Sequence, residues 1–448
     1  MFESDEQEIV LNPRVTEVVT VLILWGMFLV SLVLPLALGL FFLATGALFM
    51  VLNRARLDKV TLILLLNISY WLFSGLLVGS ISPRDLLSPQ FFNGDGRILI
   101  GYSPLLLFGA AAIQWSNVDL LVKTLFHIAL AALFFFAVWF VTGASFLSEG
   151  MAGNYVGFMT SHTGGGTFFG ALAVFLILFG HLAKNRIIQI TGWLMLIPML
   201  AASSRSSILA FLAVSGWYIV KMRNPRVIAG GALALILVTA SIPVLFPHTW
   251  NRTLVLFDPA LVTSLVEQIE ASEEFEPTIR SENEDRDWNL VGPQHNVLAR
   301  VMFWSYAVRR FIQSPIFGIG FGRYNDGSLE LSGIDGFVYM AFGGQKRLGA
   351  GSAHNSYLHI LCESGLLGLA LLLWLWSSIY FRLQAGSREF QNWRDMHALM
   401  VASQGLVVFG LFAALAGHAL AAPSLMLMIA TVVGVALAAQ RSFGARPG

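Results

Sequence analysis

Residues 163–182 read TGGGTFFGALAVFLILFGHL, a run of twenty residues without a single aspartate, glutamate, lysine or arginine. A helix needs about 20 predominantly apolar residues to cross the hydrocarbon core of a bilayer. The run therefore predicts a membrane-spanning helix. Similar runs recur on both sides of it along the chain.

The whole chain has the composition of a membrane protein. Of its 448 residues, 56% are hydrophobic and 12% are charged, which is about half the charged share of a soluble globular protein. Lys and Arg number 27 against 26 Asp and Glu, so no cationic excess exists to neutralise phosphates and nucleic acid is not expected as a partner. The single cysteine, Cys362, excludes an internal disulfide and a cysteine-cluster metal site.

The apolar runs predict an all-α polytopic membrane protein of about twelve transmembrane helices. They divide the chain into an N-terminal membrane region of about nine helices (1–246), an extracytoplasmic loop between helices nine and ten (247–355), and a C-terminal membrane region of about three helices (356–448). The expected spans are 16–34, 35–52, 60–79, 98–114, 120–145, 163–182, 187–203, 206–220, 227–246, 356–380, 396–417 and 421–440.

The distribution of positive charge predicts the orientation of these helices. Cytoplasmic loops carry an excess of Lys and Arg, so both termini are expected in the cytoplasm and the large loop on the outer face of a bacterial inner membrane. The inner residues are then Arg54, Arg56, Lys59, Lys123, Lys184, Arg186, Lys221, Arg223, Arg226, Arg382, Arg388, Arg394, Arg441 and Arg446, whereas the short outer loops hold only Arg84, Arg97 and Arg205.

The large loop changes character along its length. Nine acidic residues lie between positions 267 and 287, which indicates a solvated strip rather than a binding site. Residues 296–313 carry apolar side chains at helical spacing and predict an amphipathic helix. The run SPIFGIGFG at 314–322 then ends that helix with proline and glycine.

Two polar residues lie at the expected outer rim of the membrane. His354 precedes the tenth span, and imidazole is the side chain best suited to accept a proton near neutral pH. The alternative is a structural histidine bonded to a neighbouring carbonyl. Arg205 lies between two apolar spans, where a guanidinium is costly, and its fixed donors suit a diphosphate. The alternative there is an arginine that reaches a lipid headgroup.

Other candidates lie on the amphipathic helix and beside the glycine-rich start of the sixth span. Arg300 and Trp304 are four residues apart and share one helix face; they could bind an anion and a sugar, or rest the helix on the bilayer. Arg309 suits a solvated or headgroup position. His162 precedes three glycines that permit close helix packing or a reshaped backbone at a cavity.

A set of motifs surrounds the amphipathic helix and the start of the tenth span. His354 and Asn355 are followed, after nine residues, by two glycines three positions apart, Gly365 and Gly368. The pattern of Arg, ten residues and Gly occurs twice, in Arg205 with Gly216 and in Arg309 with Gly320. With RVMFW at 300–304 and SPIFGIG at 314–320, this segment resembles the core of the O-antigen ligase and polymerase superfamily, which includes the protein O-oligosaccharyltransferases.

The resemblance implies an inverting glycosyltransferase that needs neither a metal nor a cofactor. Its donor would be a glycan linked to undecaprenyl diphosphate, used on the outer face of the inner membrane in cell-surface polysaccharide biosynthesis. In that reading His354 acts as general base on the acceptor hydroxyl. Arg205, Arg300 and, more weakly, Arg309 bind the diphosphate and stabilise its departing charge.

The resemblance also implies the acceptor classes and further contacts. Trp304, Tyr324 and His162 are expected to contact the sugar or the acceptor. A ligase transfers to lipid A core and a polymerase to a second lipid-linked glycan; the histidine pattern favours the ligase and the arginine pattern the polymerase. A twelve-helix solute transporter and a non-catalytic envelope assembly component are the alternative functions.

Overall fold

The computed structural model describes residues 58–88, 91, 96–110, 113–143, 155, 162–222, 300, 303–304, 307–308, 310–325 and 352–444. Within these residues the chain forms α-helices and short 3-10 turns and contains no strand. The predicted all-α fold class is therefore confirmed for this part of the chain.

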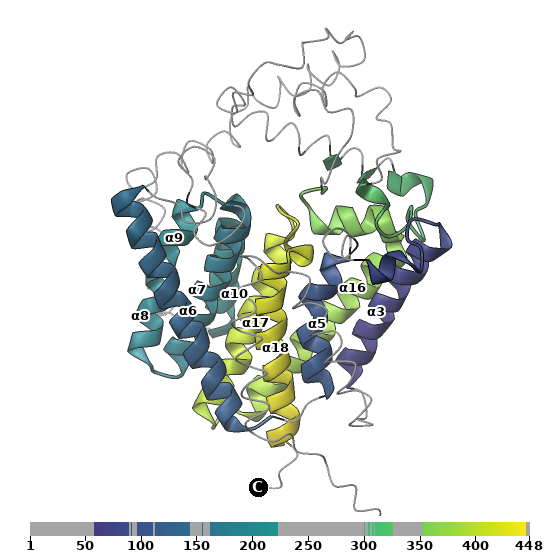
Figure 1. Ribbon diagram of the computed structural model, residues 1–448. Coiled ribbons are helices and arrows are strands. Elements are labelled where there is room, and N and C mark those ends of the chain that lie inside the picture. The colour runs from purple at the N-terminus through teal and green to yellow at the C-terminus, as the bar shows by residue number, and fades with distance from the viewer. Residues whose placement is uncertain are drawn as a thin grey trace, which may run out of the picture.

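The helices pack side by side with their long axes roughly aligned (Figure 1). Six of them are long and apolar enough to cross a membrane: α3, α6, α7 from Gly164, α16, α17 and α18. The helices are α3 (Lys59–Leu77), α5 (Arg97–Ala110), α6 (Trp115–Thr142), α7 (His162–Leu182), α8 (Arg186–Leu194), α9 (Leu196–Ala201), α10 (Arg205–Met222), α16 (Ser356–Glu389), α17 (Arg394–Ala413) and α18 (Pro423–Gly444).

The described helices overlap the spans expected over the same residues, and six of these spans correspond to helices that could cross a membrane. Each span from 60–79 to 206–220, and from 356–380 to 421–440, overlaps a described helix. The expected spans 16–34, 35–52 and 227–246 lie outside the described residues. The total of about twelve helices, the three-part division of the chain and the placement of the 247–355 loop therefore stay predictions.

Two helix boundaries between α8 and α10 differ from the sequence expectation. The span at 187–203 is broken at Met195 into α8 and α9, because the ring of Pro198 clashes with the carbonyl four residues earlier and cannot continue the helix. Arg205, expected between the spans 187–203 and 206–220, is the first residue of α10. The turn before it is short because Ser203 adopts a left-handed conformation (φ 53°) that reverses the chain in few residues.

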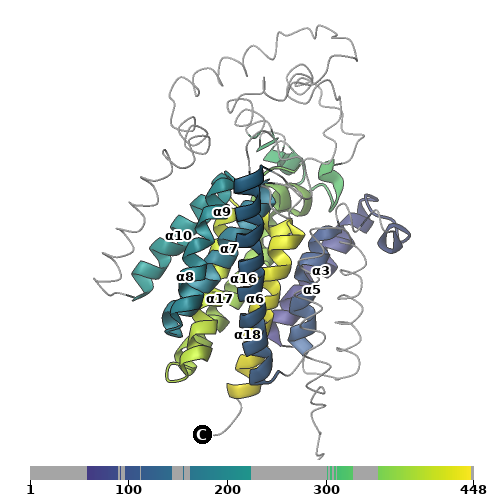
Figure 2. The ribbon, with the colours of Figure 1, turned by 60° about the vertical axis from the view of Figure 1, so that its left-hand side comes forward.

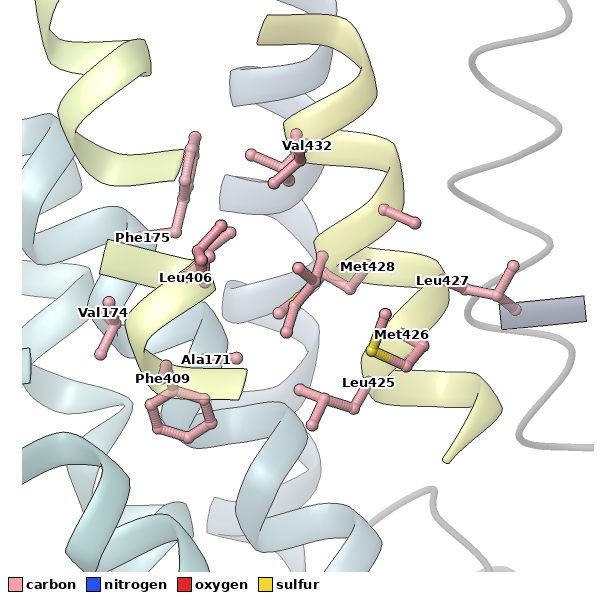
Figure 3. Packing of buried hydrophobic residues seen from close by; sticks show 14 of the residues in the cluster. Ala171, Val174, Phe175, Leu406, Phe409, Leu425, Met426, Leu427, Met428 and Val432 are labelled. Atoms are coloured by element: carbon pink, nitrogen blue, oxygen red, sulfur yellow. The ribbon is translucent and has the colours of Figure 1, made fainter. Parts of the chain in front are cut away.

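The core lies between α7, α17 and α18. Figure 3 shows Phe175 of α7, Leu406 and Phe409 of α17 and Val432 of α18 among its buried side chains. Small residues let the helices approach closely, as is common in membranes. A β-carbon added to Gly101 of α5, for example, would lie 2.7 Å from Cβ of Met426.

The outer helices expose apolar side chains around the perimeter. α6 lies at the front of the view in Figure 2, and its Phe134 and Phe140 are 64% and 74% exposed. Only 22% of its most apolar window is buried. This pattern is expected of a helix that faces lipid, where exposed apolar side chains cost nothing.

Ion pairs stabilise the end of the bundle at which α3 starts and α18 finishes. The buried carboxylate of Asp58 accepts a hydrogen bond from Arg441 Nη1 at 2.9 Å and lies 3.6 Å from Arg382 Nη1. A buried carboxylate is stable only when paired in this way. These two arginines, predicted to be cytoplasmic, thus lie at the end opposite to the start of α16.

Candidate active site

His354 occupies a strained backbone position immediately before α16. Its φ is 47°, a left-handed conformation that is uncommon outside glycine and is concentrated at functional sites. Asn355 follows and caps α16: its side chain accepts two N–H groups of the first turn and donates to the carbonyl of Leu415 at 3.0 Å. This cap fixes the helix start and with it the backbone of His354.

The imidazole of His354 lies against the segment that carries Arg300. Its ring centroid is 5.6 Å from that of Phe303. Burial lowers the pKa of His354 to about 4, and the positive charge of Arg300 contributes to the lowering. The imidazole is therefore neutral at pH 7 and can accept a proton. The described residues among 296–313 are helical, as predicted.

The loop at 314–322 is bound into a break in α16. Gly365 has φ 64° and ψ −168°, so the helix is kinked there. This kink was not predicted from the sequence. The helix also extends to Glu389, beyond the expected end at 380. Backbone hydrogen bonds of 2.9 to 3.2 Å join the two segments: Ile319 N to Cys362 O, Gly320 N to Glu363 O, Leu366 N to Pro315 O and Leu367 N to Ile316 O.

The glycines of these motifs are required by the close approach of the two backbones. A β-carbon on Gly365 would collide with the carbonyl of Ile316, and one on Gly318 with the backbone of Glu363. Both glycines have positive φ, which side chains disfavour. The spacing of Gly365 after His354 is thus the distance from the helix start to the kink.

The structure requires a glycine in only one of the two arginine–glycine patterns. Gly320 has φ 107°, and a β-carbon there would collide with Val78. Gly216 lies inside α10 with open space around it, so nothing described requires glycine at that position. Arg309, which pairs with Gly320 in its pattern, lies outside the described residues, and its predicted role stays a prediction.

α3 supports the loop from its other side. Tyr70 Oη donates to the carbonyl of Ser364 at 2.9 Å, and Ser80 Oγ donates to that of Phe321 at 2.6 Å. The rings of Trp71 and Phe321 stack with their centroids 6.1 Å apart. The loop is therefore held between α3 and the kink of α16.

Two histidines near the 314–322 loop and the kink of α16 were not predicted as site residues from the sequence. His359 Nε2 lies 3.5 Å from Glu363 Oε2, one helical turn further along α16, and the rings of His359 and His418 are 4.4 Å apart. Burial, followed by His359, Arg97 and His354, lowers the pKa of His418 well below its usual range. The spacing of His359 and Glu363 was a usable signal, whereas His418, in the turn between α17 and α18, gave none.

Tyr324 and Trp304 lie in different surroundings. Tyr324 is 1% exposed, and its hydroxyl donates to the carbonyl of Phe303 at 3.2 Å. Nε1 of Trp304 is buried and finds no acceptor among the described residues. A buried indole N–H usually has a partner, so this donor suits a ligand oxygen. The predicted sugar contacts of both side chains are not tested by these positions.

The turn between α17 and α18 lies between the start of α16 and the start of α10, which carries Arg205. Ser356 Oγ, two residues after His354, donates to the carbonyl of Gly417 at 3.2 Å. A β-carbon on Gly417 would lie 3.5 Å from Oγ of Ser206 in the first turn of α10. Ser206, next to Arg205, and Ser356, two residues after His354, therefore both lie against this turn.

The start of α7 lies against the residues that precede α10. A β-carbon on Gly166 would collide with Cβ of Ser204, so these two helix starts are in contact. His162 begins α7, as expected, but its side chain lies outside the described residues. Its predicted contact with the sugar or acceptor stays a prediction.

No group of three or more His, Cys, Asp or Glu side chains within the described ranges could hold a metal ion. The long apolar helices indicate a multi-pass membrane protein. His354, at one bundle end near Arg300, gives it a polar site at its helix ends.

Residues 190–373 match the family model described as O-Antigen ligase. This part of the chain is therefore similar to the O-antigen ligase family, which supports the resemblance seen in the motifs at 300–368. The match begins in α8 and ends within α16, so it includes Arg205, Arg300 and His354. None of the curated proteins compared with the chain matches it.

Proposed function

We propose that this protein is an inverting glycosyltransferase of the ligase or polymerase type. It takes a glycan linked to undecaprenyl diphosphate and acts at the outer face of the bacterial inner membrane. The observation that carries the proposal is the position of His354, whose imidazole packs against Phe303 on the segment that carries Arg300. A base and a cation side by side suit a reaction in which one oxygen loses a proton while another leaves as an anion.

The proposed reaction is a single displacement at the anomeric carbon. His354 accepts the proton of the acceptor hydroxyl as its oxygen forms the new bond to that carbon. The bond between the carbon and the diphosphate oxygen breaks, and its electron pair leaves with undecaprenyl diphosphate. Attack from the face opposite the leaving group inverts the configuration, and the proton on His354 then passes to water.

Arginines supply the positive charge in this mechanism. Arg300 and Arg205 bind the diphosphate through fixed, forked donors and stabilise the charge that develops on departure. A guanidinium does not titrate in the working range, so this charge is always present. The N–H of Trp304, which is buried without a described acceptor, would donate to a sugar hydroxyl.

Transfer by the purified full-length protein in lipid vesicles tests the proposal. We expect transfer from a lipid-linked glycan with inversion at the anomeric carbon, seen by NMR of the product. Excess EDTA should leave the rate unchanged, because guanidinium groups replace the metal; a metal-dependent glycosyltransferase run in parallel should lose its activity. Lack of transfer to every acceptor offered would contradict the proposal.

The acceptor in the same assay separates the two subclasses. Transfer to lipid A core indicates a ligase, and elongation of a second lipid-linked glycan indicates a polymerase. Deletion strains provide the matching result in cells. Single-repeat lipid intermediates accumulate when a polymerase is missing, whereas long polymer stays on its carrier when a ligase is missing.

The pH dependence of kcat/KM follows from the low pKa of His354. Only the neutral imidazole accepts a proton, so the rate should be constant above its pKa and fall as the pH drops through it. With a pKa of about 4, we expect no decrease in kcat/KM between pH 8 and pH 6, because this ratio reports the free enzyme. A histidine with the ordinary pKa of about 6.5 would already be mostly protonated at pH 6.

Arg300→Ala supplies the matched comparison for this profile. Removal of the positive charge should raise the pKa of His354, so the acid limb should move to higher pH. An acid limb near pH 6.5 in the unaltered protein, or a limb that does not move in the variant, would contradict the assignment of His354 as the base beside Arg300.

A further inference from the structure

Glu363 is a buried carboxylate behind the proposed base. It is 3% exposed, and its Oε1 accepts the backbone N–H of Tyr324 at 3.1 Å. Its other oxygen lies 3.5 Å from His359 Nε2. The carboxylate therefore has two partners, one on its own helix and one on the loop that follows the amphipathic segment.

Tyr324 extends this contact towards the site. Its hydroxyl donates to the carbonyl of Phe303 at 3.2 Å, and the Phe303 ring lies against the ring of His354. These contacts form a series from Glu363 through Tyr324 and Phe303 to His354. Both ends of the series lie near the start of α16. Arg300 lies three residues before Phe303, one helical turn away.

We propose that Tyr324 and Glu363 are positioning residues that hold Arg300 beside His354. This inference rests on the proposed function, because it concerns the placement of the diphosphate-binding cation relative to the base. Tyr324 is buried, and its hydroxyl is hydrogen-bonded to the carbonyl of Phe303. Its two hydrogen bonds fix the helical segment that carries Arg300 onto the kinked start of α16.

The charge of Glu363 favours a positioning role over a binding role. A carboxylate on this side of the site repels a diphosphate, so its negative charge does not assist donor binding. Its useful property is an oxygen that accepts the N–H of Tyr324. Glutamine retains that oxygen without the charge, whereas leucine retains only the volume.

A double-mutant cycle of Tyr324→Phe with Arg300→Ala tests the inference in the vesicle assay. Loss of one buried hydrogen bond should lower kcat/KM for the donor by roughly fivefold to tenfold. If Tyr324 acts through Arg300, the same replacement should have almost no effect in the Arg300→Ala background. Additive losses would overturn the inference, because a general loss of packing does not depend on Arg300.

Tyr357→Phe is the matched control. Tyr357 lies on α16 and its hydroxyl also donates to a backbone carbonyl, that of Leu411, at 2.7 Å. Its replacement should remove an equivalent bond, and its effect on kcat/KM should be the same with and without Arg300. If the effect of Tyr357→Phe on kcat/KM depended on Arg300 as strongly as that of Tyr324→Phe, the specific role of Tyr324 in positioning Arg300 would be contradicted.

Replacement of Glu363 provides a second test with a structural readout. Glu363→Gln should retain kcat/KM within about threefold, and Glu363→Leu should lose at least as much as Tyr324→Phe. Hydrogen exchange of residues 300–325 should be faster in Glu363→Leu and unchanged in Glu363→Gln. Equal activity of the two variants would overturn the inference while leaving the proposed function intact; no transfer by the unaltered protein would overturn both.

Discussion

Replacement of His354 by alanine is expected to reduce glycan transfer by about 100-fold to 10,000-fold, the usual contribution of a general base. The expectation rests on the position of the imidazole. It is neutral at pH 7 and packs against Phe303, in the segment that carries Arg300. The variant should still fold, because the cap of α16 is made by Asn355 and not by the imidazole. Transfer rate in vesicles and glycan analysis of the strain would both show the loss.

The comparison requires equal amounts of protein in the membrane. His127→Ala is a suitable control, since His127 is an exposed residue of α6 outside the site, and it should retain the rate within about twofold. Arg205→Ala should lose about 100-fold if it stabilises the leaving diphosphate. Normal glycan in both the His354→Ala and Arg205→Ala strains would eliminate the enzymatic proposal.

The sequence predicted the described helices well because hydropathy is a local property. A span such as 163–182 must be a helix wherever it lies, since a bilayer offers no partner for its backbone groups. Pro198 was also visible in the sequence, and its ring favours the break between α8 and α9. Helix ends were less certain: α16 continues to Glu389 because no residue after 380 forces it to stop.

Site residues could be predicted where a motif or their place beside a span marked them. Residues that join the site only through contacts between distant parts of the chain could not be predicted. His354 was identified because it precedes a span and completes a motif. His418 could not be, because its contact with His359 joins residues 59 positions apart. Gly365 was recognised as part of a pattern, but its reason appears only in three dimensions, where the loop at 314–322 bonds to the helix on both sides of it.

Gly365→Ala is expected to destabilise the site strongly. Its φ of 64° and ψ of −168° lie in a region that is essentially restricted to glycine, with a cost of about 1–3 kcal/mol for other residues. The added β-carbon would also collide with the carbonyl of Ile316. The loop must then shift, and a displacement of about 1 Å can lower a rate by about 100-fold.

Gly216→Ala provides the matched control, because it makes the same chemical change in the second glycine motif. Gly216 is inside α10 with open space around it, and alanine is favoured over glycine in a helix by up to about 1 kcal/mol. This variant should retain its thermal stability and its transfer rate, whereas Gly365→Ala should lose both. If the two variants behaved alike, the glycine at the kink would be dispensable, and the bonding of the 314–322 loop into α16 could not be what places Arg300 and His354 together.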